Sequence, residues 1–321
     1  MSSARPPLYV VILAAGKGRR MGAPVSKVML PLCGKPILQR TIDAAASLRP
    51  AKIIIVVGGN EDEIRGKVSG PRLVYAKQRV INGNAGAVKA AMPLIPDRAR
   101  VLALFGDGIL TPAQLRALAA GVGPEAVSIR LLRSADGRGY SRFLRDAKGR
   151  IVDLVPEKSL TPAQRKIEEC DAGGQGFPAA WARRQLGRIK PHAKGGELYL
   201  TELIGMAAAA GMRVNAVEVS AEEGVNINAP ANLLQAEAHL GARLVAEMQR
   251  RGVLFADPNT VVVRGDVSAA KGAFIDRNVI LAGRVVLKAG AVVGANCMLE
   301  DTVLGPDARL EPFTQACGAV L

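Results

Sequence analysis

A six-residue period near the C-terminus constrains the fold more than any other feature of this 321-residue chain. Such hexads are typical of a three-sided parallel β-helix, in which each hexad makes one side and its aliphatic residue fills the interior. The register is kept except for one step of five, and eight hexads predict about two to three coils. The repeated positions are Ile275, Leu281, Leu287, Val293 and Leu299, followed after the shorter step by Leu304, Leu310 and Ala316.

The first two thirds of the chain follow another pattern, in which short apolar runs alternate with helical segments. The runs at 8–15, 52–57, 73–76 and 101–105 predict strands, and 36–48 and 85–94 predict helices. This alternation indicates a mostly parallel sheet with helices on both faces. An amphipathic helix is expected at 230–252. The predicted domains are therefore 1–229, the connecting helix 230–252, and the repeat domain 253–321.

Charge and composition limit the possible partners. The net charge of +15 suits nucleic acid, a membrane surface or phosphorylated substrates, or else a general arginine-rich surface. The basic residues are scattered and only 3% of residues are aromatic, so no nucleic-acid partner is expected. No apolar run is long enough to span a membrane. Four separated cysteines without a CxxC pair, and a start that lacks a signal-cleavage pattern, predict a reduced, cytoplasmic protein without a zinc site.

The first apolar run opens into LAAGKGRRMGAPVSK, residues 13–27, where two glycines and several cations lie together. A P-loop needs GxxxxGK[ST], which is missing, and a dinucleotide fingerprint needs a small residue where Met21 stands. Nucleotidyl transfer fits better, because backbone amides can hold a nucleotide while cations neutralise the charge that develops on pyrophosphate.

This loop resembles the signature of the sugar-nucleotide pyrophosphorylases, L-A-A-G-x-G-x-R-M followed by a lysine. Further blocks follow in matching order: KQRVINGNAGAV, LFGDG, GGELYLTELI and EEGVNINAPANL. With the hexads behind them, the chain is most similar to the bifunctional N-acetylglucosamine-1-phosphate uridylyltransferase and glucosamine-1-phosphate acetyltransferase type. The resemblance implies a Rossmann-like α/β transferase domain with a mixed, mostly parallel sheet, followed by a short left-handed parallel β-helix.

The resemblance also implies roles for individual residues. Arg20 and Lys27 match the catalytic cations, and Asp107 and Asn226 match the pair that holds Mg²⁺, the expected cofactor. The implied nucleotide-binding residues are Leu13, Ala14, Ala15, Gly16, Gln78, Gly83, Asn84 and Gly106. The implied sugar-binding residues are Tyr140, Ser141, Glu157, Asp171 and Thr201.

The sugar side departs from the family pattern, since Ser141 replaces a glycine and Asp171 an asparagine. We expect transfer of a nucleotidyl group from an NTP, UTP by resemblance, to N-acetylglucosamine-1-phosphate. A different sugar-1-phosphate, or a weakened regulatory or scaffold homologue that binds sugar nucleotides, stays open. Because no histidine follows Gly252, no acetyl transfer by this chain is expected. The resemblance implies a homotrimer.

Overall fold

The computed structural model describes residues 5–16, 25–192, 196–224 and 226–321. The chain forms two compact units. The first comprises Met1–Met29 and Ile37–Ala229, and the second Leu30–Pro36 and Pro230–Leu321. Residues 30–36, which the sequence places within the first domain, therefore belong to the second unit.

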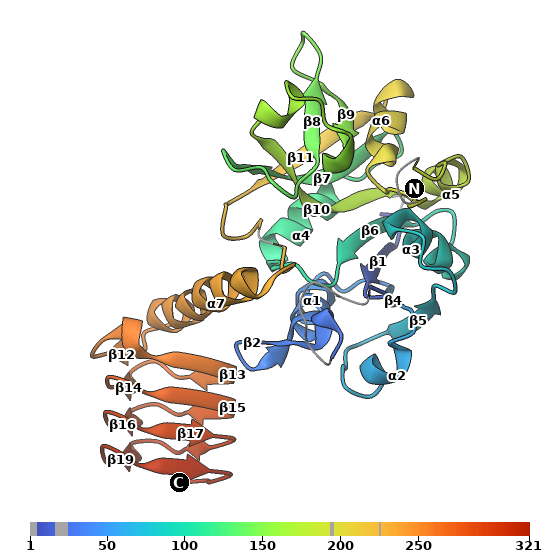
Figure 1. Cartoon of the computed structure of the whole chain (residues 1–321). Helices are drawn as coiled ribbons and strands as arrows, with labels where there is room; N and C mark the ends of the chain where they lie inside the picture. The colour runs from blue at the N-terminus through green and yellow to red at the C-terminus, as the bar shows by residue number, and fades with distance from the viewer. Residues whose placement is uncertain (1–4, 17–24, 193–195, 225) are drawn as a thin grey trace. The chain divides into compact units, whose positions relative to one another are not determined.

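A nine-stranded sheet forms the centre of the first unit (Figure 1). Its main path runs β11-β7-β10-β6-β1-β4-β5, and β8 and β9 extend it beside β10. Neighbours along the path are parallel except at β10, which is antiparallel to both β6 and β7. The strands are β1 (Leu8–Leu13), β4 (Lys52–Val57), β5 (Leu73–Lys77), β6 (Arg100–Phe105), β7 (Ala126–Arg133), β8 (Arg142–Arg145), β9 (Ile151–Val155), β10 (Glu169–Pro178) and β11 (Arg213–Val219).

Helices cover both faces of this sheet, because its central strands are apolar on both sides. In β1, Val10 and Ile12 face one core while Val11 faces the other. The first core also holds side chains of α1 (Ile37–Ala46), α2 (Glu61–Ile64) and α4 (Pro112–Ala120). The second holds side chains of α3 (Asn84–Ala91), α5 (Ala179–Leu186) and α6 (Glu202–Ala209). Short 3₁₀ turns are η2 (Lys27–Met29), η3 (Met92–Leu94), η4 (Glu157–Ser159) and η5 (Gln164–Lys166).

The predicted α/β class and mostly parallel sheet are confirmed. The four predicted strands are present and end within two residues of their expected bounds. The helix expected at 36–48 is α1, which is shorter at both ends. The segment expected at 85–94 forms α3 and then η3, because Pro93 lacks the backbone N–H that would continue the helix.

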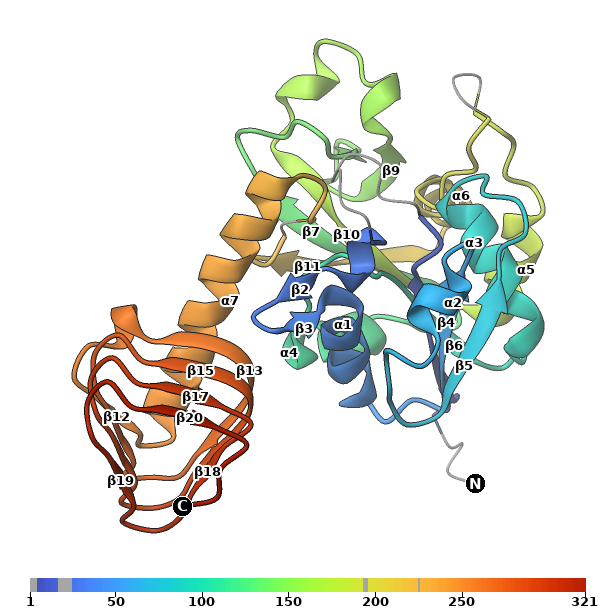
Figure 2. The ribbon, with the colours of Figure 1, turned by 60° about the horizontal axis from the view of Figure 1, so that its bottom comes forward.

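The second unit combines one long helix, α7 (Pro230–Arg250), with stacked parallel strands (Figure 2). Two sheets run β12-β14-β16-β19 and β13-β15-β17-β20, with β18 also paired to β15. The elements are β12 (Leu254–Phe255), η6 (Pro258–Thr260), β13 (Val262–Ala269), β14 (Phe274–Ile275), β15 (Ile280–Leu287), β16 (Val292–Val293), β17 (Met298–Glu300), β18 (Val303–Leu304), β19 (Arg309–Leu310) and β20 (Gln315–Cys317).

The register of these strands follows the hexads. Val262 pairs with Ile280 and Ile280 with Met298, a step of three hexads, whereas Val286 pairs with Val303 across the single step of five. All eight repeated aliphatic positions are buried. Parallel strands at this spacing around one aliphatic core are consistent with a β-helix.

A small hairpin, β2 (Pro31–Leu32) and β3 (Lys35–Pro36), joins the second unit from the N-terminal part of the chain. The Cys33 amide donates to a Glu237 carboxylate oxygen at 2.7 Å, and Lys35 pairs with Asp266 at 2.5 Å. Gly34 has φ +80°, and a Cβ there would lie 1.9 Å from the Arg264 carbonyl oxygen. The turn therefore needs glycine. Within the described ranges, no helix has both the length and the apolar character needed to cross a bilayer.

Candidate active site

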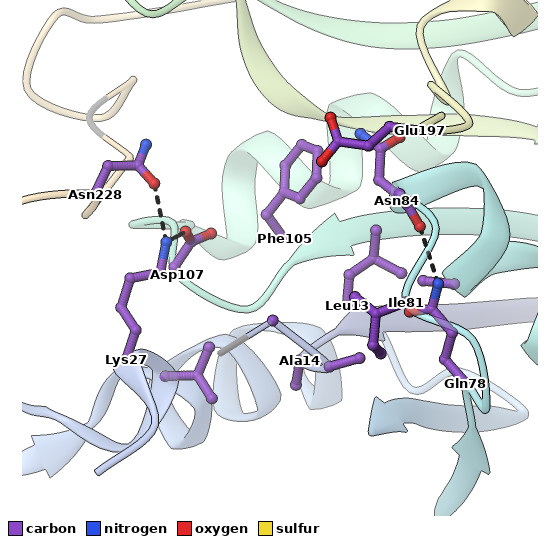
Figure 3. Close-up of a pocket in the computed structure, with 15 residues that line it drawn as sticks. Leu13, Ala14, Lys27, Gln78, Ile81, Asn84, Phe105, Asp107, Glu197 and Asn228 are labelled. Atoms are coloured by element: carbon purple, nitrogen blue, oxygen red, sulfur yellow. Dashed lines mark hydrogen bonds and ion pairs between the residues drawn. The ribbon is translucent and has the colours of Figure 1, made fainter. Parts of the chain in front are cut away.

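A cavity of about 370 Å³ opens at the carboxyl ends of β1 and β6, the edge where open parallel sheets bind ligands (Figure 3). Segments far apart in the sequence meet there. The lining residues are Leu13, Ala14, Ala15, Gly16, Lys27, Val28, Gln78, Ile81, Gly83, Asn84, Ala87, Phe105, Asp107, Glu197 and Asn228.

The end of β1 forms one wall of the cavity, and its backbone is held by neighbouring strands. The Ala14 amide donates to the Val56 carbonyl at 2.9 Å, and Asn60 Nδ2 donates to the Ala14 carbonyl at 2.8 Å. The Gly106 amide donates to the Leu13 carbonyl at 3.0 Å, so Gly106 supports this wall although it does not line the cavity. The predicted Arg20 lies outside the described residues.

Lys27 is the positively charged residue among those that line this cavity. Its Nζ pairs with Asp107 Oδ2 and donates to Asn228 Oδ1 at 2.9 Å (Figure 3). The side chains of Lys27 and Asp107 are only 15% and 16% exposed, so water screens this pair weakly. A lysine held in this way is suited to neutralising phosphate charge.

Asp107 and Asn226, the predicted metal pair, lie on adjacent segments. The Ile227 amide donates to the Asp107 carbonyl at 3.1 Å, and Gly108 and Asn226 form an isolated antiparallel bridge. Asn226 itself does not line the cavity. The described residues contain no group of three or more His, Cys, Asp or Glu side chains arranged for a metal. One carboxylate and one amide oxygen still fit Mg²⁺, which is usually held by one or two carboxylates together with substrate phosphates.

The opposite wall contains the predicted base-binding residues. Gln78 is buried, and its Nε2 donates to the Gly83 carbonyl at 3.1 Å and to Asn82 Oδ1 at 3.2 Å. Gly83 has φ +103°, and a Cβ there would lie 2.4 Å from the Leu198 carbonyl oxygen. Asn84 Oδ1 accepts from the Leu200 amide at 2.7 Å. The turn at 82–85 is thus fastened to residues 198–200.

Three polar or aromatic lining residues, Phe105, Glu197 and Asn228, are absent from the sequence prediction. Each lies inside a motif already recognised: LFGDG, GGELYLTELI and EEGVNINAPANL. Glu197 Oε2 accepts from the Tyr199 hydroxyl at 2.8 Å and from Lys158 at 3.3 Å, and these hydrogen bonds keep its pKa below the usual value. The three motifs thus contain further residues that line the cavity, and the roles assigned from the resemblance omitted these positions.

None of the five predicted sugar-binding residues lines this cavity. The Asp171 amide donates to the Ser141 carbonyl at 3.0 Å, the Tyr140 hydroxyl donates to the Gly224 carbonyl at 3.4 Å, and burial raises the Tyr140 pKa. Glu157 accepts from the Gly139 amide at 3.0 Å. The Thr201 hydroxyl is buried and finds no hydrogen-bond partner in the described part of the chain. Their role in sugar binding stays a prediction.

Asp171 has an unusual environment. Its Oδ1 accepts from the Gly173 amide at 2.8 Å, and dense surrounding protein raises its pKa from the usual 3.8 to about 6 despite that bond and the positive charge of Arg130. Desolvation disfavours the charged carboxylate here more than the two favourable contacts stabilise it.

Comparison with known proteins identifies the family. Residues 10–203 match the MobA-like NTP transferase domain. The chain is 35% identical to the bifunctional protein GlmU of Azoarcus sp. over 96% of this chain and 68% of that protein. It is also 35% identical to the GlmU of Paraburkholderia phytofirmans over 97% of this chain and 69% of that protein.

Solved structures agree on the fold. A putative glucose-1-phosphate thymidylyltransferase from Bacillus anthracis superposes with a TM-score of 0.59 at 19% identity, covering 72% of this chain and 94% of that one. A UDP-glucose pyrophosphorylase complexed with UDP-glucose gives 0.60 at 17% identity, covering 76% and 100%. The matching domain, the identity along nearly the whole chain and the cavity at the sheet edge together show that the chain belongs to the GlmU-type nucleotidyltransferases with a MobA-like NTP transferase domain.

Proposed function

We propose that the protein catalyses Mg²⁺-dependent transfer of a nucleotidyl group from UTP to N-acetylglucosamine-1-phosphate. The observation that carries the proposal is that Lys27, Asp107, Gln78, Asn84 and the end of β1 line one cavity. The similarity of the chain to GlmU proteins favours the uridine nucleotide and the N-acetylated sugar among the substrates of related transferases.

In the proposed reaction, a phosphate oxygen of the sugar-1-phosphate attacks the α-phosphorus of the triphosphate. A new P–O bond forms, the bond to the β-phosphate oxygen breaks, and pyrophosphate leaves with the electron pair. Most of the catalysis in such a transfer comes from positioning and electrostatic stabilisation. Lys27, and by resemblance Arg20, would neutralise the negative charge that accumulates on the phosphates.

Asp107 and Asn226 are the residues proposed to hold Mg²⁺. The ion would neutralise phosphate charge and orient the triphosphate. Lys27 pairs with Asp107 in the free protein, so that carboxylate already has a partner before ligands arrive. When a triphosphate enters, the same ammonium group can pair with phosphate oxygens.

Nucleotide selection is assigned to the wall opposite Lys27. Gln78 would contact the base, since its amide presents both a donor and an acceptor, and Gly83 and Asn84 would contact the base and ribose. The apolar side chains of Leu13, Ile81 and Ala87 line the cavity beside these polar groups and would contact the base. Tyr140, Ser141, Glu157, Asp171 and Thr201 are retained as the proposed sugar contacts.

A pyrophosphate-release assay tests this function. Four nucleoside triphosphates are crossed with a panel of sugar-1-phosphates, each with and without Mg²⁺. The highest kcat/KM is expected for UTP with N-acetylglucosamine-1-phosphate, and no release without metal. Another preferred sugar would replace the sugar assignment alone. Binding of UDP-N-acetylglucosamine by calorimetry without turnover of any pair would support the regulatory alternative.

For residues 253–321 we propose a left-handed parallel β-helix that assembles the chain into a homotrimer. The parallel 18-residue register supports the β-helix, and the resemblance to the bifunctional transferases supports the trimer. Acetyl transfer is not part of the proposed function, because these residues contain no histidine to act as a general base. Incubation of the 321-residue protein with acetyl-CoA and glucosamine-1-phosphate should release no free CoA.

A further inference from the structure

Arg130 stands in the middle of β7, where a buried cation is unusual. The strand reads AVSIRLLR, and Arg130 is only 2% exposed among aliphatic neighbours. Its guanidinium nonetheless finds several acceptors. Nη1 donates to the carbonyls of Ala172 at 3.0 Å and Gly173 at 3.2 Å, and Nη2 donates to the carbonyls of Glu223 at 2.8 Å and Ile109 at 3.4 Å and to Gln114 Oε1 at 3.2 Å.

The four backbone acceptors belong to three separate segments. Residues 106–111 follow β6 and contain Asp107. Residues 172–173 lie where the register between β10 and β7 shifts. Residues 220–229 connect β11 to α7 and contain Asn226 and Asn228. One side chain therefore fastens together the segments that carry the proposed metal pair and one partner of Lys27.

The bulge in β10 is in turn packed against the cavity. Gly173 has φ +76°, and a Cβ there would lie 2.6 Å from the ring of Phe105, which lines the cavity. A Cβ on Gly173 would also lie 3.6 Å from Asn226 Oδ1. A shift of the bulge would thus be transmitted directly to Phe105 and to the segment of Asn226.

Burying the charge of Arg130 costs free energy that an aliphatic residue at this position of β7 would not. Desolvation of a guanidinium is unfavourable unless hydrogen bonds replace the lost water, and an aliphatic residue would fill the same space without that cost. Burial lowers the Arg130 pKa to about 10, although Asp171 and Glu223 oppose this shift, so the side chain stays protonated at neutral pH. The fork geometry of arginine explains its use, because its N–H donors are spread over a rigid plane, whereas the donors of lysine all lie on one nitrogen.

We propose that Arg130 is a positioning residue for nucleotidyl transfer, whose guanidinium fixes the segments of Asp107, Gly173 and Asn226 relative to one another. The inference rests on the proposed function. It assigns no contact with substrate to Arg130 itself.

The test compares Arg130→Lys and Arg130→Met with two controls. Arg133→Met changes another arginine of β7, which is 58% exposed and pairs with Glu169 and Glu218. Leu186→Ala truncates a buried residue of α5 and lowers stability without touching the three segments. Steady-state kinetics are measured well below each variant's melting temperature. Amide hydrogen exchange of the free protein is followed by mass spectrometry.

Both Arg130 variants should lower kcat by about tenfold or more with KM for the triphosphate changed by less than about threefold, because misplaced groups lose transition-state stabilisation before ground-state affinity. Exchange should rise at 106–111, 172–174 and 220–228 together. Arg133→Met and Leu186→Ala should leave kcat and these three segments unchanged.

A folded Arg130→Lys protein with wild-type kcat would overturn the positioning role. The role would also be overturned if the Arg130 variants lost no more kcat than Leu186→Ala does. Unchanged exchange in any of the three segments would refute the proposed fastening. Lack of transfer by the unmodified chain would refute the proposed function, and the exchange measurement would still decide whether Arg130 holds the segments together.

Discussion

Replacing Asp171 with asparagine should stabilise the first unit in a pH-dependent way. The folded protein raises this pKa from 3.8 to about 6. In the intervening pH range the folded carboxyl keeps its proton while the unfolded one has lost it. The folded state then binds more protons, so its stability falls as pH rises, and the cost is complete above about pH 6.

The magnitude follows from the size of the shift. A rise from 3.8 to about 6 corresponds to at most about 3 kcal/mol, since one pKa unit is about 1.4 kcal/mol. Asp171 keeps part of its surface accessible, and water on that side screens the charge, so this figure is an upper bound. Between about pH 4.5 and about pH 8 the stability difference between Asp171→Asn and wild type should grow by up to about 2 kcal/mol.

Urea unfolding followed by fluorescence measures this difference. Trp181, the single tryptophan, is buried in α5 and reports on the first unit alone. At about pH 4.5 the folded wild-type carboxyl and the variant amide are both mostly neutral, so the charge of Asp171 beside Arg130 enters the comparison only at the higher pH, and the pKa of about 6 already includes it. Asp62→Asn, at an exposed position of α2, controls for the removal of one negative charge. An Asp171→Asn difference that is equal at both pH values would refute the reasoning.

Three further outcomes are expected. Lys27→Ala should lower kcat by about 10²- to 10³-fold in protein that is still folded at the assay temperature, because one preorganised cation is lost from the cavity; near wild-type pyrophosphate release would exclude Lys27 from catalysis. Gly83→Ala should destabilise the turn by roughly 1–3 kcal/mol and weaken UTP binding measured by calorimetry, because its Cβ would meet the Leu198 carbonyl. Gly149→Ala, which also has a positive φ (+75°) but lies in open space, should leave UTP binding unchanged. Equal UTP affinities for the two variants would contradict this. Multi-angle light scattering should give about three times 33.6 kDa, and a monomeric mass would refute the proposed trimer.

The sequence predicted what depends on periodicity and on short motifs. The hexads fixed the buried positions from Ile275 to Ala316, and the apolar runs located the strands whose ends form the cavity. These signals are local, because the backbone geometry of a helix or strand sets how often its side chains face the same way. Gln78, Asn84, Lys27 and Asp107, which the motifs singled out, line one cavity in the structure, and their roles stay predictions.

What the sequence missed depends on contacts between distant segments. Arg130 is visible in AVSIRLLR as a charge within an apolar strand, but its four carbonyl partners lie at 109, 172, 173 and 223 and follow from no local pattern. For the same reason, the predicted domain 1–229 included residues 30–36, which group with the second unit in the structure. Its partners, Glu237 and Asp266, are more than two hundred residues away along the chain.

This hairpin means that the two units are connected by the chain at three places rather than one: after Met29, after Pro36 and after Ala229. A protein cut at residue 229 would keep the hairpin but lose the side chains that hold it, and residues 230–321 produced alone would lack Cys33 and Lys35 as partners for Glu237 and Asp266. Neither half is a self-contained module for grafting or exchange. The first of these connections also directly follows η2, so the polypeptide that carries Lys27 is anchored at its far end in the repeat-bearing unit.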